Sequence, residues 1–212
     1  MSLLRVHNLS VSLDGFAAGE PQTLEQPMGH GTGRLHAWMF RTRMWSPSGP
    51  TGVDDTFAQR NLVGIGAEIM VANKFGPPGW HEDPTWRGWW GEDPPFHTPT
   101  YVLTHRPREP LEMEGGTTFH FLSTSPADAL AIAQEAAGDL DVRIGGGATT
   151  VRTFVAAGLV DHLHLAMVPI VLGRGTLLWD GLEGLEEQFH VESVVAPSGV
   201  VHLSLTRRTS EA

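Results

Sequence analysis

Three consecutive glycines, Gly145 to Gly147, constrain this chain more than any other stretch of its sequence. They follow a short apolar run at 140–144 and precede the apolar run 154–157, so they lie where a predicted strand passes into a predicted helix. A backbone without Cβ atoms lets a ligand approach closely, and the free N–H groups of a helix's first turn attract anions. The stretch therefore predicts either a phosphate-binding turn or a tight turn without a ligand, because it matches neither common nucleotide-binding glycine fingerprint.

The length and composition are those of one ordinary folded domain. The chain has 212 residues, 41% of them hydrophobic, and no long polar tract divides it, so we expect a single domain over residues 1–212. The absence of cysteine excludes disulfides, thiolate metal sites and cysteine nucleophiles. No apolar run is long enough for a membrane span and the N-terminus does not read as a signal peptide, so we expect a cytoplasmic protein with no membrane partner.

The formal net charge of −10 disfavours nucleic acid as a partner, because most of the surface would repel a polyanionic backbone. A dinucleotide remains compatible with this charge. Its few phosphates can be met locally by a helix N-terminus and one or two side chains.

Hydrophobic patterning predicts eight strands and four helices. The predicted strands are 4–13, 67–72, 100–104, 118–122, 140–144, 160–171, 188–195 and 200–206, and the predicted helices are 35–45, 54–61, 125–137 and the segment from the glycine turn to Gly158. The mixed order, with early crossovers and a late hairpin, predicts an α/β fold. We expect a mainly parallel sheet with an antiparallel edge and helices on both faces.

Several other residues have both a functional and a structural interpretation. Asp14 follows the first predicted strand, where ligands gather in open α/β sheets, but aspartate also forms turns. His36 is interpreted as a capping or packing residue, since no partner carboxylate is visible in the sequence. His162 and His164 share a strand face that can bind zinc, although no third ligand is apparent. The tryptophan-rich segment 79–99 is either an ordered loop that buries aromatic surface or a wall of a substrate pocket.

Taken together, these motifs resemble the dihydrofolate reductase-like superfamily. Within it, the chain is similar to the branch represented by the C-terminal reductase domain of the riboflavin-biosynthesis deaminase-reductase. The matching motifs extend over nearly the whole chain, and they are specific only as a set. They are 12–15, 35–38, 88–91, 94–99, 102–107, 144–147, 163–165, 168–169 and 172–175.

The resemblance implies an eight-stranded, mostly parallel mixed sheet with a C-terminal antiparallel hairpin. It also implies hydride transfer from NADPH, with NADH possible, to a small unsaturated or heterocyclic substrate, and a homodimer. On the family pattern, the pyrophosphate is held by Gly145, Gly146, Gly147 and Ala148 with help from Thr149 and Thr150, and the adenosine ribose and its phosphate lie near Thr104, His105 and Arg106. Ser10 flanks the nicotinamide by its main chain, and Asp14 faces the substrate as a polar anchor or proton relay.

Two departures from the family pattern concern the cofactor and the substrate. Val71 and Ala72 stand where the family has glycine and arginine, and the lost guanidinium contact to the 2′-phosphate costs about 1.5–3 kcal/mol, or roughly ten- to a hundredfold in affinity. In this interpretation the missing guanidinium is replaced by Lys74, Arg106 or Arg108. We include Ala72 and Lys74 in the predicted cofactor site. Arg34 or Leu35 replaces the carboxylate of folate-reducing members, so we do not expect dihydrofolate reduction itself.

The sequence leaves three functional hypotheses. The first is a reductase that uses a reduced nicotinamide. The second is a catalytically idle ligand-binding protein on the same scaffold, with a cofactor site altered at Val71 and Ala72. The third is a metal-dependent hydrolase that uses some of the eleven histidines, although we predict no metal site.

Overall fold

Two units make up the computed structural model, which describes residues 2–209. Unit one contains the chain up to Arg5 together with Gly64–Leu159, and unit two contains Val6–Val63 and the chain from Val160 onward. Strand β1 (Leu4–Ser12) begins in unit one and continues into unit two. Each unit therefore combines segments that are distant in the sequence.

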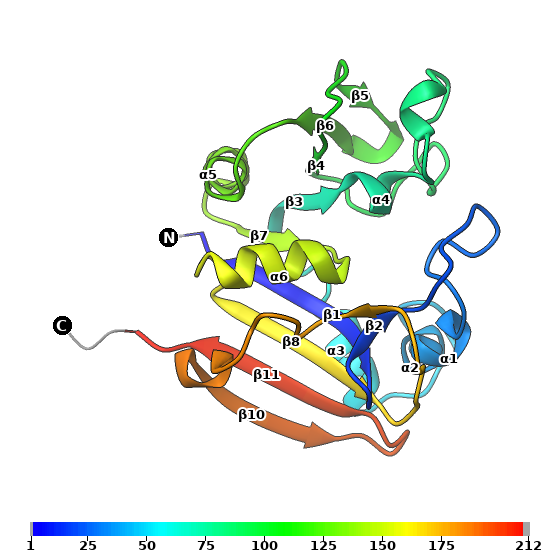
Figure 1. Ribbon diagram of the computed structural model, residues 1–212, viewed down its shortest axis with the longest axis vertical. Helices are drawn as coiled ribbons and strands as arrows, with labels where there is room; N and C mark the ends of the chain where they lie inside the picture. Colours follow the sequence, from blue (N-terminus) through cyan, green and yellow to red (C-terminus); the bar gives the residue numbers. More distant parts are fainter. Residues whose placement is uncertain (1, 210–212) are drawn as a thin grey trace. The chain divides into compact units, whose positions relative to one another are not determined.

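The sheet of unit one has the order β7-β3-β4-β6-β5 (Figure 1). Its strands are β3 (Ile65–Val71), β4 (Pro99–Leu103), β5 (Leu111–Glu112), β6 (Thr118–Leu122) and β7 (Asp141–Ile144). The first four strands of that order run parallel, and β5 is antiparallel to β6. Parallel neighbours place their carboxyl ends at one edge of the sheet, which is where such sheets bind ligands.

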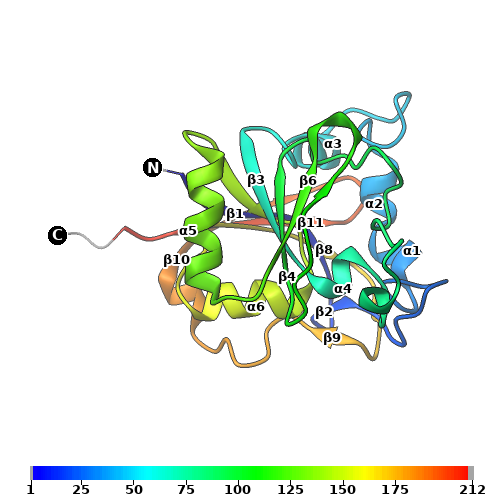
Figure 2. The same cartoon turned by 90° about the horizontal axis from the view of Figure 1, so that it is seen from above.

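The helices of unit one are α4 (Ala72–Phe75), α5 (Pro126–Ala137) and α6 (Ala148–Ala156), with short 3-10 turns η1 (Trp80–Glu82) and η2 (Glu114–Gly116). Helix α5 packs on β3, β4 and β7 (Figure 2). Its start is as predicted, because the Ser125 side chain accepts a hydrogen bond from the Asp128 amide and Pro126 occupies the first turn.

A largely aromatic cluster forms part of the core of unit one. The cluster is Met70, Phe75, Trp80, Phe96, Val102, Met113, Phe119 and Phe121, with Trp86 and Trp90 packed against it. The tryptophan-rich segment 79–99 thus supplies core of unit one, in agreement with the expectation that it buries aromatic surface without regular structure.

Unit two contains the antiparallel strands β8 (His162–Val168), β11 (Val201–Arg207) and β10 (Phe189–Val195), with β1 beside β8. A separate ribbon pairs β2 (Phe16–Ala18) with β9 (Thr176–Leu177). Its helices are α1 (Thr32–Leu35), α2 (Ala37–Phe40), α3 (Val53–Gln59) and the 3-10 turn η3 (Leu185–Gln188). One apolar cluster of this unit consists of Leu35, Trp38, Ala58, Ala166, Val168, Leu172 and Val200.

All eight predicted strands are present, and β2, β5 and β9 are short additions. The prediction of one helix over 35–45 was wrong, because the backbone leaves helical geometry at His36, between α1 and α2, and α2 already ends at Phe40. Helix α4 was not predicted; the strand expected to end at Ala72 ends at Val71. Within the described part of the chain, no helix is long and apolar enough to cross a membrane. The single domain over 1–212 stays a prediction.

Candidate functional site

Most of the predicted cofactor residues follow the C-terminal ends of three neighbouring strands of unit one, β7, β3 and β4. Ile69 of β3 is in register with Ile144 of β7, and Val71 is in register with Leu103 of β4. The segments that leave these strands begin at Ala72, Thr104 and Gly145. Residues that the sequence scatters over almost eighty positions therefore start from adjacent strands at one edge of the sheet.

The glycine turn presents open backbone at the start of α6. Gly146 has a φ of 99°, which favours glycine. Gly147 is the N-cap residue of α6, is exposed, and would carry a Cβ with no atom within 4 Å. In residues 2–209, nothing accepts a hydrogen bond from the backbone N–H groups of residues 146–150. These groups fit a phosphate, because a helix N-terminus with free amides binds anions.

Thr149 and Thr150 lie in the first turn of the same helix. Thr149 is exposed, whereas Thr150 is buried. The Thr150 hydroxyl has no hydrogen-bond partner among the described residues. A buried polar atom without a partner is costly, so this hydroxyl is a second observation in favour of a polar ligand at the turn.

A buried ion cluster, formed by Glu68, Lys74 and Arg143, lies directly behind the turn. Glu68 of β3 and Arg143 of β7 are register partners, so their side chains lie next to each other. Arg143 contacts Glu68 Oε2 through Nε at 2.9 Å and also through Nη2, while Lys74 Nζ donates to Glu68 Oε1 at 3.0 Å. Burial alone would raise the pKa of Glu68, but the two cations outweigh it and lower that pKa below its usual value.

The ion cluster changes the role expected of Gly145. A Cβ built on Gly145 would overlap Lys74 Nζ and Glu68 Oε1, and the Gly145 amide already donates to Ile69 O at 3.3 Å. Its missing side chain therefore makes room for Lys74 and Glu68, whereas we had expected it to make room for a ligand. Gly146 and Gly147 remain the open part of the turn. Sequence reasoning missed Glu68 and Arg143; the available signal was a pair of charges inside two apolar strands.

The residues expected at the adenosine end are mostly exposed and locally paired. The Thr104 hydroxyl accepts a hydrogen bond from the Arg106 backbone amide, and His105 and Arg106 are exposed. The Arg106 guanidinium contacts His81 Nε2. Arg108 donates to Trp86 O at 3.3 Å and lies 5.3 Å from the centroid of the Phe121 ring.

Asp14, in unit two, fastens a loop. Its carboxylate accepts hydrogen bonds from the Ser12 hydroxyl at 2.6 Å and from the amides of Leu172 and Gly173 at 3.0 and 2.6 Å. Burial acts to raise the pKa of Asp14, but these hydrogen bonds together lower it from 3.8 to about 2. An aspartate with this pKa is ionised at neutral pH, so the geometry favours the anchoring role over proton donation.

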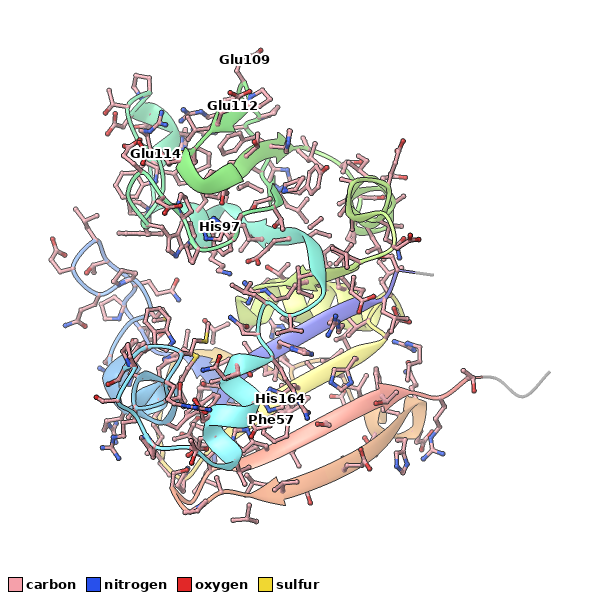
Figure 3. The ribbon with its side chains drawn as sticks, turned by 180° about the vertical axis from the view of Figure 1, so that it is seen from behind. Phe57, His97, Glu109, Glu112, Glu114 and His164 are labelled. Atoms are coloured by element: carbon pink, nitrogen blue, oxygen red, sulfur yellow. The ribbon has the colours of Figure 1, made fainter. Side chains whose placement is uncertain are left out.

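Ser10, the residue expected beside the nicotinamide, is buried in β1, and its hydroxyl accepts a hydrogen bond from Trp38 Nε1 at 2.9 Å. Nearby, His164 Nε2 lies 3.0 Å from His202 Nδ1, and His202 Nε2 lies 2.8 Å from Asp54 Oδ1. Phe57 stacks on both imidazoles, and Figure 3 shows it beside His164. Both nitrogens of His164 have partners, which argues against the zinc interpretation of this strand.

A family model described as the RibD C-terminal domain matches residues 6–203. A search of curated proteins gave no significant match. Among solved structures, the chain is similar to a putative riboflavin biosynthesis protein from Shewanella sp. PV-4, with 21% identity, a TM-score of 0.63, and coverage of 99% of this chain and 100% of that one.

Two further solved structures share the fold at lower identity. A pyrimidine reductase-like protein from Corynebacterium diphtheriae has 15% identity and a TM-score of 0.52, with 99% of this chain and 93% of that chain covered. Dihydrofolate reductase from Enterococcus faecalis, complexed with NADP(H) and RAB-propyl, has 16% identity and a TM-score of 0.52, with 98% and 97% covered. The expected α/β fold, with a mostly parallel mixed sheet and C-terminal antiparallel strands, is confirmed.

Proposed function

Because the chain belongs to the RibD C-terminal domain family, we propose that it is a reductase that transfers hydride from NADPH or NADH to a small conjugated or heterocyclic substrate. Family membership supports the oxidoreductase class. One observation of the structure carries the cofactor assignment. The N–H groups of residues 146–150 and the buried Thr150 hydroxyl have no partner among the described residues, and they are donors of the kind that a phosphate group requires.

The proposed mechanism depends mainly on positioning. A bound reduced nicotinamide would supply the hydride, and the chain's own residues would orient it and exclude water. Amides at the start of α6 would hold the diphosphate through hydrogen bonds that require no side chain. Asp14 keeps the loop at Leu172 and Gly173 in place. A protonation step would draw its proton from another donor, since the Asp14 carboxyl is ionised.

Nucleotide binding tests this proposal directly. We expect millimolar NADPH or NADH to raise the melting temperature, because a ligand at a hundred times its Kd stabilises the folded state by about 2.7 kcal/mol. Emission from the seven tryptophans should be quenched in parallel. Adenosine, which carries no phosphate, is the control and should have a much smaller effect. If neither dinucleotide alters melting or fluorescence, the proposal fails.

The second candidate is a catalytically idle binding protein, and the observation that favours it is the pair Val71 and Ala72. Val71 ends β3 and Ala72 opens α4, at the strand edge where the family has glycine and arginine. The double variant V71G/A72R separates the two proposals. A large gain in NADPH affinity would favour a degenerate cofactor site, whereas unchanged tight binding would show that other groups already hold the dinucleotide.

The remaining expectations need their own measurements. Within residues 2–209, no group of three histidine, aspartate or glutamate side chains is placed to hold a metal. We propose a homodimer on the family pattern, and light scattering of the purified protein tests it by giving the mass in solution.

A further inference from the structure

Lys74 is the only lysine of the chain, and its ammonium lies at the glycine turn. Nζ donates to Glu68 Oε1 at 3.0 Å and lies 5.5 Å from the centroid of the Phe96 ring. The side chain remains 23% exposed, whereas that of Glu68 is 1% exposed. A buried carboxylate therefore holds the ammonium of a partly exposed side chain in a defined position.

The Lys74 ammonium has more N–H donors than its hydrogen bond to Glu68 uses. A lysine ammonium has three N–H donors, and only the bond to Glu68 is formed within the described part of the chain. Burial lowers the pKa of Lys74 and the Glu68 carboxylate opposes that shift. Nζ of Lys74 lies against the position that a Cβ atom of Gly145 would occupy. Neighbouring Cα atoms are about 3.8 Å apart, so an anion on the amides of Gly146 and Gly147 would be within reach of this ammonium.

Of the three cations that the sequence offered in place of the missing arginine, only Lys74 contacts this turn. Arg106 contacts His81, and Arg108 is bonded to Trp86 O and packed over Phe121. The 2′-phosphate of NADPH is on the adenosine ribose, whereas the diphosphate is common to NADPH and NADH. The location of Lys74 thus matches the diphosphate.

We propose that Lys74 binds the diphosphate of the dinucleotide and that Glu68 is the positioning residue that holds its ammonium at the glycine turn. This inference rests on the proposed function and adds a specificity assignment to it. Lys74 contributes equally to NADPH and NADH binding and does not replace the arginine missing at Ala72. Recognition of the 2′-phosphate, where it occurs, comes from other groups.

Affinity measurements on Lys74→Met give the first test, by titration calorimetry with ADP, NADH and NADPH. Loss of one charge-assisted contact predicts the same fall in affinity, roughly ten- to a hundredfold, for all three. Arg208→Met is the control, because it removes an exposed cation that has no part in the proposed cofactor site and should leave all three affinities unchanged. A loss with Lys74→Met that is confined to NADPH, or no loss at all, would overturn the inference.

A second test needs no variant and is independent of whether Lys74→Met folds. Protein grown with 13C- and 15N-labelled lysine gives signals from one lysine side chain, because the chain has only one. ADP, which carries the diphosphate, should shift these signals, and 2′-AMP, which carries only the 2′-phosphate, should not. The reverse pattern, or ADP binding without a shift, contradicts the inference while the proposed function stands. A wild-type protein that binds no dinucleotide overturns both.

Discussion

His164 donates a hydrogen bond from Nε2 to Nδ1 of His202, 3.0 Å away, and the partners on either side fix this direction. The Asn8 amide donates to His164 Nδ1 at 3.1 Å, so that nitrogen carries no proton and Nε2 must carry one. His202 Nδ1 accepts it, which leaves His202 Nε2 to donate to Asp54. Protonation of His164 at Nδ1 would place the new Nδ1–H group against the N–H group of the Asn8 backbone amide.

Acid should therefore weaken unit two through His164. Burial first, and then the nearby His202, His7, His162 and Arg60, lower the pKa of His164 from 6.5 to about 2. Between these values the unfolded chain binds a proton that the folded chain does not. Stability is thus retained above pH 6.5 and lost as the pH falls below it, by about 1.4 kcal/mol per unit.

Chemical unfolding between pH 4 and pH 8 measures this effect. The variant His164→Gln should show a flatter pH dependence, and His190→Gln, at an exposed position, should keep the wild-type slope. Equal slopes for the wild type and His164→Gln would contradict the assignment of the acid sensitivity to this imidazole.

Substitution of Asp14 should affect the loop at Leu172 and Gly173. Asp14→Asn retains one oxygen acceptor and turns an NH2 group toward a backbone amide, so we expect a loss of about 1 kcal/mol in the free energy of unfolding. The contribution of the carboxylate is present above pH 3.8 and lost as the pH falls toward its folded pKa of about 2. Hydrogen exchange of the two loop amides provides the measurement, and unchanged protection would contradict the anchoring role.

Gly145→Ala should destabilise unit one. The new methyl group would overlap Lys74 Nζ and Glu68 Oε1, and overpacking of this kind costs about 1–3 kcal/mol. Gly147→Ser is the comparison, because its Cβ meets open space and serine is a good N-cap residue. We expect thermal unfolding to show a loss for the first variant and none for the second. The second should still lower dinucleotide affinity, since its side chain enters the approach to the amides.

Glu68→Gln should be among the more damaging isosteric changes in the chain. It leaves the cations of Lys74 and Arg143 without the buried carboxylate that both contact, and breaking a buried ion pair costs about 3–5 kcal/mol. Glu192→Gln on β10 is the control, because Glu192 is exposed and should change stability by less than about 0.5 kcal/mol. A Glu68→Gln protein as stable as the wild type in urea would contradict the packing described for this cluster.

Local pattern was enough to predict most of the fold. Short apolar runs and alternation of apolar with polar residues located all eight predicted strands, and the Ser125-Pro126 signal located the start of α5. The helix over 35–45 failed because apolar spacing continues across His36, although the backbone there does not remain helical. Periodicity reports which side chains are buried, and it does not report a break in the main chain.

The candidate site was predictable only in part, and the reason is sequence separation. The glycine turn is a local feature and was identified from the residues. Glu68 and Arg143 are 75 positions apart, and His202 and Asp54 are 148 apart, so only strand register and tertiary packing bring them together. Asp14 was located correctly after β1, but its amide partners 158 and 159 residues away decide that it anchors a loop.

The Glu68 cluster also restricts how this protein can diverge. Loss of any one of its three charged side chains removes a partner from an ion pair with the buried Glu68 or leaves that carboxylate's partners unpaired, so we expect single substitutions there to be destabilising. Simultaneous replacement by apolar residues of similar volume avoids this penalty, but it also removes the ammonium that we propose for the diphosphate. Relatives of this chain that bind the same dinucleotide should therefore keep the trio intact.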